Sequence, residues 1–324
     1  MRRPVAFVGV VTGGLALFAS GCLSGGAEVD DAVPTFFDDS TSTVEPETTD
    51  DTSSTTASTT IPIVERLPAL ADEVAGAVRS ADGSLLPITG TDGDVWFVLG
   101  PCGDEQIEPG ASAVVVGAHH VMLDPGAAAV SLAVAEKSAA LLRSDGVVVA
   151  LTHTGSSELS ARTRSAVGPA VGAAAFVSIH HPVADGSETG DVRPSVVHRA
   201  DHSESRRLAG LIHEEVVAAF AGLSGSLATQ NEAGVYPLLN QRGDDYYRVL
   251  QLEGGGAGAR VDLLAFGENE TTLLTTEEGR DIEAQALADA IVRFLITEEE
   301  GNGFINPIEA VRTAPTSNTP GGCG

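Results

Sequence analysis

Apolar positions along this chain form short continuous runs that alternate with segments in which they recur at helical spacing. The runs cover residues 113–116, 147–151, 173–179 and 261–266. The helical segments cover residues 131–143, 203–220 and 282–296. Continuous apolar runs of this length are typical of strands that are covered on both faces. Their alternation with amphipathic helices predicts an α/β fold with a mostly parallel central sheet and helices on both faces.

A second pattern precedes this alternation. Two short apolar runs, 85–88 and 95–98, are separated by Thr91-Asp92-Gly93-Asp94. Asp and Gly are favoured in tight turns because they tolerate the backbone angles that such turns require. Residues 85–98 are therefore predicted to form a β-hairpin ahead of the main domain.

Composition divides the chain into five parts. Residues 1–21 begin with Met1 and two arginines and continue as an apolar run, which predicts a signal peptide. Residues 22–60 are rich in Ser, Thr and Asp without apolar periodicity, so they are expected to be a disordered tether. Residues 61–110 hold a short helix and the hairpin, 111–298 the α/β domain, and 299–324 a tail.

The three cysteines suggest a lipid anchor and a disulfide bond. Ala19-Ser20-Gly21-Cys22 resembles a bacterial lipobox, in which the Cys is diacylated and becomes the mature N-terminus. Lipidation of Cys22 would place the protein at the outer face of the cell membrane; plain secretion is the alternative. Cys102 and Cys323 then remain as one pair for an oxidising compartment, with two unpaired thiols as the alternative.

Net charge restricts the partners. The chain has 45 Asp and Glu against 18 Lys and Arg, a formal charge of -27. Nucleic-acid binding and electrostatic attachment to anionic lipid both need clustered cations, so neither is expected. Contact with a membrane is predicted only through the lipid anchor.

Histidines give the first indication of chemistry. All eight lie between His119 and His213, and four form the doublets His119-His120 and His180-His181. Each doublet follows a predicted strand, where open α/β sheets place their binding crevices. Because neutral imidazole is a favoured zinc ligand, the doublets predict a zinc site. The others are expected at the surface or the sheet rim: His153, His198, His202 and His213.

Two motifs surround these doublets, VVVGAHH at 114–120 followed by DPGA at 124–127, and FVSIH at 176–180. Together they resemble the zinc-dependent N-acetylmuramoyl-L-alanine amidases of the amidase_3 type. The resemblance extends from about Pro101 to Phe294 and includes NQRGDDYY at 240–247. It implies that His120 and His180 bind zinc.

The remainder of the implied site has no direct match. The family's zinc-binding Glu lies in a loop that is missing here, and Ala127 stands at its position; Asp124 could substitute as a ligand or cap a turn. The family's catalytic Glu corresponds to Leu263. Asp262 beside it could act as general base, or could be an ordinary rim residue.

The family hydrolyses the bond between the lactyl group of muramic acid and L-alanine. Because a zinc ligand and the base are both unmatched, we expect a lipid-anchored cell-wall protein that binds peptidoglycan, with a partly eroded active site and hydrolysis in doubt. The alternative is an active zinc amidase that uses Asp124 or Asp262. The sequence does not identify a partner hydrolase that such a protein could regulate.

Overall fold

The computed structural model describes six parts of the chain: residues 62–107, 114–155, 159–181, 193–221, 234–264 and 276–305. The predicted signal peptide and tether, with Cys22, lie outside these ranges, as does Cys323. Cys102 is disulfide-bonded, and its predicted pairing with Cys323 remains a prediction. Within the described ranges, every helix is too short or too polar to cross a lipid bilayer.

Five strands form an antiparallel sheet in the order β4-β3-β2-β1-β5. They are β1 (Ala77–Arg79), β2 (Leu85–Asp92), β3 (Val95–Gly100), β4 (Gly103–Ile107) and β5 (Val114–Val116). Asp92 pairs with Val95, which leaves Gly93 and Asp94 as the turn between β2 and β3. Gly93 has a φ of 57°, a conformation that side chains disfavour. The predicted hairpin is confirmed.

Six strands form the second sheet, in the order β10-β9-β11-β8-β6-β7. They are β6 (Val121–Pro125), β7 (Val149–Leu151), β8 (Ala175–His180), β9 (Arg193–His198), β10 (Gly234–Pro237) and β11 (Ala257–Leu264). Strands β7, β6, β8 and β11 run parallel to one another. β9 and β10 are parallel to each other, and β9 is antiparallel to β11. The predicted mostly parallel sheet is confirmed.

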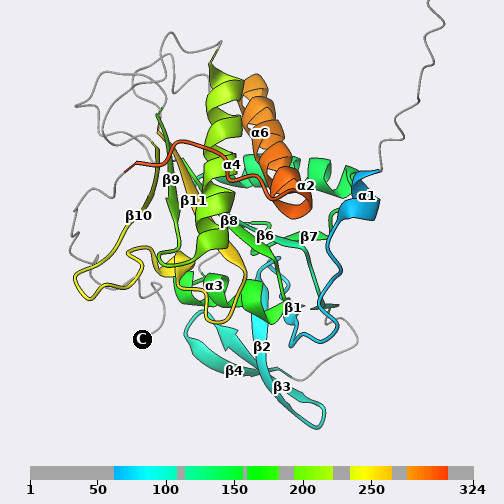
Figure 1. Ribbon diagram of the computed structural model, residues 1–324. Helices are drawn as coiled ribbons and strands as arrows, with labels where there is room; N and C mark the ends of the chain where they lie inside the picture. The colour runs from blue at the N-terminus through cyan, green and yellow to red at the C-terminus, as the bar shows by residue number, and fades with distance from the viewer. Residues whose placement is uncertain are drawn as a thin grey trace, which may run out of the picture. The chain divides into compact units, whose positions relative to one another are not determined.

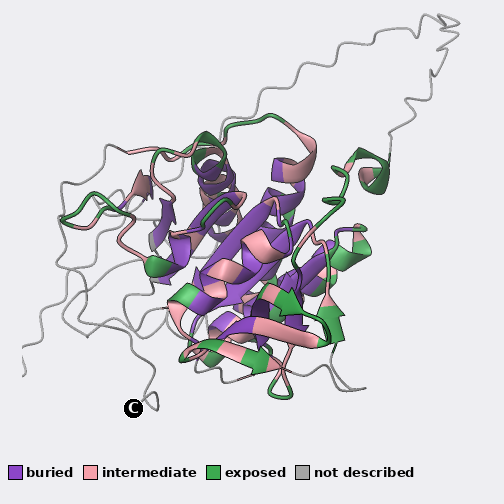
Figure 2. Ribbon diagram, turned by 90° about the horizontal axis from the view of Figure 1, so that it is seen from below, coloured by how far each residue is buried: buried purple, intermediate pink, exposed green. Residues whose placement is uncertain are grey.

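Helices cover both faces of this sheet (Figure 1). They are α1 (Ile63–Arg66), α2 (Ala129–Ser144), α3 (Ala161–Ala170), α4 (Ser203–Phe220), the 3-10 turn η1 (Arg248–Leu250) and α6 (Glu277–Ile296). α2, α4 and α6 pack together on one face, and α3 lies on the other. The strands between these layers are largely buried (Figure 2). The three predicted helices are confirmed.

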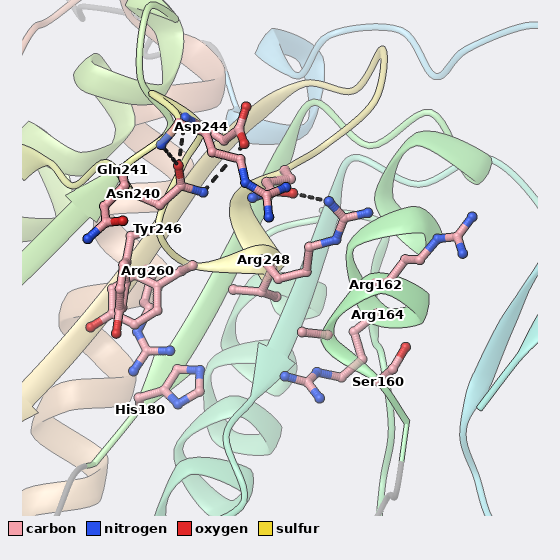
Figure 3. Close-up of a pocket in the computed structure, with 15 residues that line it drawn as sticks. Ser160, Arg162, Arg164, His180, Asn240, Gln241, Asp244, Tyr246, Arg248 and Arg260 are labelled. Carbon is pink, nitrogen blue, oxygen red and sulfur yellow. Dashed lines mark hydrogen bonds between the residues drawn. The ribbon is translucent and has the colours of Figure 1, made fainter. Parts of the chain in front are cut away.

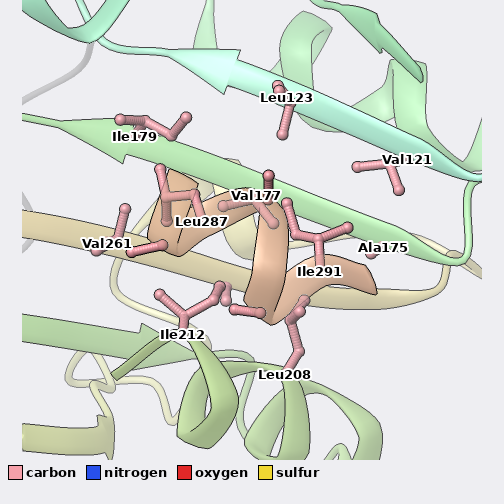
Figure 4. Close-up of a cluster of buried hydrophobic side chains, with 14 of the residues drawn as sticks. Val121, Leu123, Ala175, Val177, Ile179, Leu208, Ile212, Val261, Leu287 and Ile291 are labelled. Atoms are coloured by element: carbon pink, nitrogen blue, oxygen red, sulfur yellow. The ribbon is translucent and has the colours of Figure 1, made fainter. Parts of the chain in front are cut away.

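Side chains of the parallel strands alternate between these two faces. In β8, Val177 and Ile179 belong to the large core beneath α2, α4 and α6 (Figure 4), whereas Phe176 belongs to the core on the α3 side. Ser178 and His180 alternate in the same way and therefore face α3. This alternation decides which polar groups meet at the site.

One strand prediction is wrong. The run at 113–116 is not a buried strand of the main sheet, because β5 pairs with β1 in the antiparallel sheet. Val114 is 57% exposed and Val115 47% exposed. The core strand is β6, whose residues are all buried. Asp124 and Pro125 interrupt the apolar pattern of β6, and for that reason the sequence did not single it out.

Candidate functional site

The structure separates the two histidine doublets. His180 is the last residue of β8 and lies at the carboxyl edge of the parallel strands. His120 precedes β6, and its carbonyl oxygen accepts a hydrogen bond of 2.9 Å from the amide of Ala174, just before β8. At ~3.3 Å per residue, the strand from Ala174 to His180 places the two histidines roughly 20 Å apart.

His120 is held by backbone groups at the amino edge. Its Nε2 donates to the carbonyl oxygen of Pro68 at 2.9 Å, and its Nδ1 accepts from the amide of Val148 at 3.0 Å. The residue is buried. The predicted zinc pair of His120 and His180 is therefore not assembled, because β6, rather than the run at 113–116, is the core strand.

Asp124 lies at the carboxyl end of β6 and is fully buried. Its Oδ1 accepts from Thr152 Oγ1 at 2.7 Å and Arg164 Nε at 2.8 Å, and its Oδ2 accepts from Ser178 Oγ at 2.8 Å. Burial alone would raise the pKa of Asp124, but Arg164 and the other donors outweigh burial and lower it. Asp124 therefore positions Arg164, instead of presenting open oxygens to a metal.

Asp262 stands beside His180 in the register of β11 and β8. Its Oδ2 accepts from Arg260 Nε at 2.9 Å and its Oδ1 from Arg260 Nη2 at 2.7 Å. The guanidinium of Arg260 also lies 3.8 Å from the centre of the Tyr247 ring. Asp262 thus anchors an arginine, and this bidentate pairing leaves it poorly placed to act as a general base.

His180 lies between these two pairs. Burial, with the charge of Arg260, lowers the pKa of His180 to about 4, so the imidazole is neutral near pH 7. The Ser178 hydroxyl donates to Asp124, and its oxygen lies 2.9 Å from His180 Nε2, so that nitrogen donates to Ser178. A Cβ atom at Gly126 would lie 2.6 Å from His180 Nδ1, so only glycine permits this close approach.

His181 turns to the opposite face of the sheet. Its Nδ1 is 3.0 Å from Ser131 Oγ on α2, and its Nε2 is 2.7 Å from Glu283 Oε2 on α6. Ser131 and Glu283 are both buried. Although the residue types are those of a hydrolase triad, the fully buried Ser131 is closed to substrate. We interpret the cluster as a structural link between β8 and two helices.

The described residues do not fit a zinc site. Within the ranges that the structure describes, no three His, Cys, Asp or Glu side chains come close enough to hold a metal ion. A catalytic zinc needs three protein ligands and an open position. Ala127, which follows β6 at the edge where His180 lies, has no metal-binding atom.

A pocket of about 770 Å³ opens on the α3 face over His180 and Arg260 (Figure 3). The amino-terminal half of α3 forms one wall, and residues 240–251 form the other. Five arginines line it: Arg162, Arg164, Arg242, Arg248 and Arg260. Among the described residues of the lining, Asp244 is the one carboxylate. In a chain of net charge -27, this pocket gathers positive charge.

Sequence reasoning missed the arginines, although a signal was present. Ser178 and His180 in β8, and Arg260 and Asp262 in β11, alternate with buried apolar residues, which marks them as one face. His153 and His198, predicted at the surface or the sheet rim, are both buried, and His198 is the last residue of β9. The ring nitrogens of His153 lie 2.7 Å and 3.0 Å from two backbone carbonyl oxygens, which explains how it is accommodated.

Comparison with known proteins relates part of the chain to a family of amidases. A sequence model of the N-acetylmuramoyl-L-alanine amidases (Amidase_3) matches residues 114–255. A comparison with curated protein sequences finds no significant match.

Solved structures of amidases also resemble the chain. An N-acetylmuramoyl-L-alanine amidase of Clostridium difficile 630 is 16% identical, with a TM-score of 0.46 over 56% of this chain and 99% of that one. Ami1 of Mycobacterium abscessus is 22% identical, with a TM-score of 0.42 over 56% of this chain and 100% of that one. Residues 114–255 of this chain are therefore similar to the N-acetylmuramoyl-L-alanine amidase family.

Proposed function

We propose that this protein binds peptidoglycan in the arginine-lined pocket, and that it does not hydrolyse peptidoglycan by the zinc mechanism that its family resemblance implies. The match of residues 114–255 to the amidase family model supports peptidoglycan as the ligand. The pocket lies at the carboxyl ends of parallel strands, where α/β folds bind their ligands.

One observation in particular supports the proposal that the protein does not use zinc-dependent hydrolysis. The two carboxylates at this edge, Asp124 and Asp262, are each engaged by an arginine. A carboxylate held in this way neither completes a zinc shell around His180 nor readily accepts a proton from water. Of the expected imidazole ligands, His120 lies at the other edge of the sheet.

The test combines binding with hydrolysis. Purified protein is mixed with insoluble peptidoglycan and excess zinc, and the sedimented protein and newly released L-alanine amino termini are both measured. We expect sedimentation without release. Chelator-sensitive release that His180→Ala abolishes would overturn the proposal and favour the alternative, an active zinc amidase. Failure to sediment would refute peptidoglycan binding.

We further propose that Cys22 carries the lipid that holds the protein at the outer face of the membrane. The basic start, the apolar run and the small residues before Cys22 support this proposal. Labelled fatty acid should enter the wild-type protein, and Cys22→Ala should release the protein from the membrane fraction. Unchanged fractionation of the variant would contradict the anchor.

A further inference from the structure

The antiparallel sheet ends in two edge strands of opposite character. β4 includes Asp104 and Glu105, and charged residues on an edge strand discourage pairing with a further strand. β5, at the other end of the sheet, consists of Val114, Val115 and Val116. Val114 is 57% exposed and Val115 is 47% exposed, although both are large apolar residues. β5 is therefore the edge at which this sheet can accept another strand.

The backbone of β5 is paired along one side. Val115 stands opposite Val78 of β1, and Val114 stands opposite Arg79. Among the strands that the structure describes, β1 is the partner of β5. Alternate residues of an antiparallel pair direct their N–H and C=O groups away from the partner strand. An extended peptide that lies along the outer side of β5 would continue the hydrogen-bonded ladder.

The two faces of β5 offer different surroundings. Residues directly opposite each other in a sheet point to the same face, so Val115 shares a face with Val78 and Val114 shares the other face with Arg79. Val78 belongs to a buried apolar cluster that includes Leu86. The exposed Val115 extends this apolar face to the edge of the sheet, whereas the face of Val114 has a positive charge.

A second arginine adds to this charge. Burial, and then the charge of Arg143 in the last turn of α2, lower the pKa of Arg79, so the two guanidinium groups lie close enough to repel each other. Arg79 Nη1 donates to the carbonyl oxygen of Gly83 at 2.8 Å. Arg143 Nη2 donates to that of Val149 at 3.1 Å. Neither arginine forms an ion pair with a carboxylate of the residues that the structure describes.

These charges decide which occupant fits the edge. Pairing of two β5 strands about a two-fold axis would bring Arg79 and Arg143 of both copies together, and like charges repel. A segment with its own carboxylates would instead place them beside the two arginines. Electrostatic complementarity therefore favours an acidic partner over a second copy of this chain.

We infer that β5 is a docking edge for a partner protein, which adds an extended acidic segment to the antiparallel sheet as a further strand. Apolar side chains of that segment lie on the face of Val115, and acidic side chains alternate with them on the face of Arg79 and Arg143. The backbone ladder supplies affinity, and the alternation of side chains supplies specificity. This interaction is separate from the arginine-lined pocket and does not depend on peptidoglycan binding.

Three short peptides test the inference. A fluorescein-labelled octapeptide of alternating valine and glutamate is titrated with the purified protein, and fluorescence anisotropy measures binding. A second peptide has lysine in place of glutamate, and a third has the first sequence with every backbone nitrogen methylated. We expect the first to bind at least about tenfold more tightly than either control, because lysine is repelled by the arginines and methylation removes the ladder donors. Its affinity should fall as the salt concentration rises.

Variants locate the site. Val114→Glu supplies within the chain the carboxylate that the partner is inferred to place beside Arg79, so it should weaken the acidic peptide by about tenfold or more. Val114→Thr keeps the β-branched shape without a charge and should retain the wild-type affinity. Arg143→Gln should also weaken the peptide, whereas Arg206→Gln, at an exposed position of α4, should not. Thermal unfolding verifies that each variant is folded.

Several results would overturn the inference. They are absence of peptide binding, equal affinity for the acidic peptide and either control peptide, and equal effects of Arg143→Gln and Arg206→Gln. Concentration-dependent self-association that Val114→Glu abolishes would assign the edge to a second copy and contradict a partner strand. Binding to phosphatidylglycerol vesicles that Val114→Glu abolishes would assign it to a membrane and contradict a partner strand equally. Because β5 lies outside the pocket, sedimentation with peptidoglycan tests the proposed function separately.

Discussion

The two histidine doublets look equivalent in sequence, yet they lie at opposite edges of one sheet. His119-His120 precedes β6, whereas His180 ends β8. At the amino edge, His120 is bonded to backbone groups and the surroundings are structural. At the carboxyl edge, His180 opens onto a pocket with five arginines. The difference shows that the position of a polar residue relative to its strand, before or after, decides whether it can reach a binding crevice.

The carboxyl edge also shows how buried charged groups are stabilised at a parallel sheet. Asp124 and Asp262 are both buried, and each is paired with an arginine on the α3 face. Burying an isolated carboxylate is costly, so the pairing stabilises each ion while leaving the outer side of the arginine available to a ligand.

The largest expected effect follows from breaking one of these pairs. Asp124→Ala removes the acceptor for Arg164, Thr152 and Ser178 and leaves the arginine uncompensated. The free energy of unfolding should fall by about 3–5 kcal/mol. Urea denaturation measures it, with Asp244→Ala as a matched control at an exposed position of the pocket wall. A change below about 1 kcal/mol for Asp124→Ala would contradict the role assigned to this carboxylate.

The second prediction, of intermediate size, compares the amino edge of the sheet with the carboxyl edge, because only the carboxyl edge is proposed to bind peptidoglycan. His120→Ala deletes both hydrogen bonds of a buried ring and should cost about 1–3 kcal/mol of stability. At a temperature where the variant remains folded, it should sediment with insoluble peptidoglycan as the wild type does. His180→Ala should weaken sedimentation, because His180 lines the pocket. Equal loss of sedimentation in both variants would remove the functional distinction between the edges.

The smallest effect concerns Asp245, next to the pocket wall. Burial raises the pKa of Asp245 to about 6, above the ordinary value of 3.8, despite a hydrogen bond from the amide of Ala200. The folded state therefore favours the protonated form, and the cost of ionisation is fully present above pH 6 and disappears as pH falls toward 4. Because Asp245 is partly exposed, we expect this cost to be about 1 kcal/mol or less.

Asp245→Asn tests this. The amide can still accept from Ala200 but does not ionise, so the variant should be slightly more stable than the wild type at pH 7.5 and equal to it near pH 4. Thermal unfolding at several pH values measures the difference. A variant that is less stable at every pH would show that the carboxylate contributes more than its burial costs.

Much of the fold was accessible from the sequence, because apolar runs and helical periodicity record burial directly. The hairpin at 85–98, the helices α2, α4 and α6 and the strand β8 were predicted in this way, whereas α3 was not. β6 was not predicted, because Asp124 and Pro125 interrupt the apolar pattern of this buried strand. The apolar run at 113–116 was interpreted as the core strand instead. That single error moved the predicted zinc ligand to the wrong edge.

The site was only partly predictable. His180 was identified, and the segment 240–247 was noted as a family resemblance, but neither suggested a pocket lined with arginine. Arg164 reaches Asp124 from another element, so the pairing depends on the packing of α3 against the sheet. Such contacts between distant parts of a chain leave no local pattern, whereas the alternation of Arg260 and Asp262 within β11 does.

The central claim is that the carboxyl edge holds an anion-binding pocket in place of a zinc site, and metal content tests it most directly. The protein is purified after exposure to excess zinc, dialysed and analysed for zinc per chain, with His120→Ala and His180→Ala in parallel. The account predicts well below one zinc per chain in all three proteins, because a tight site needs at least three protein ligands. About one zinc per wild-type chain that His180→Ala removes would contradict it.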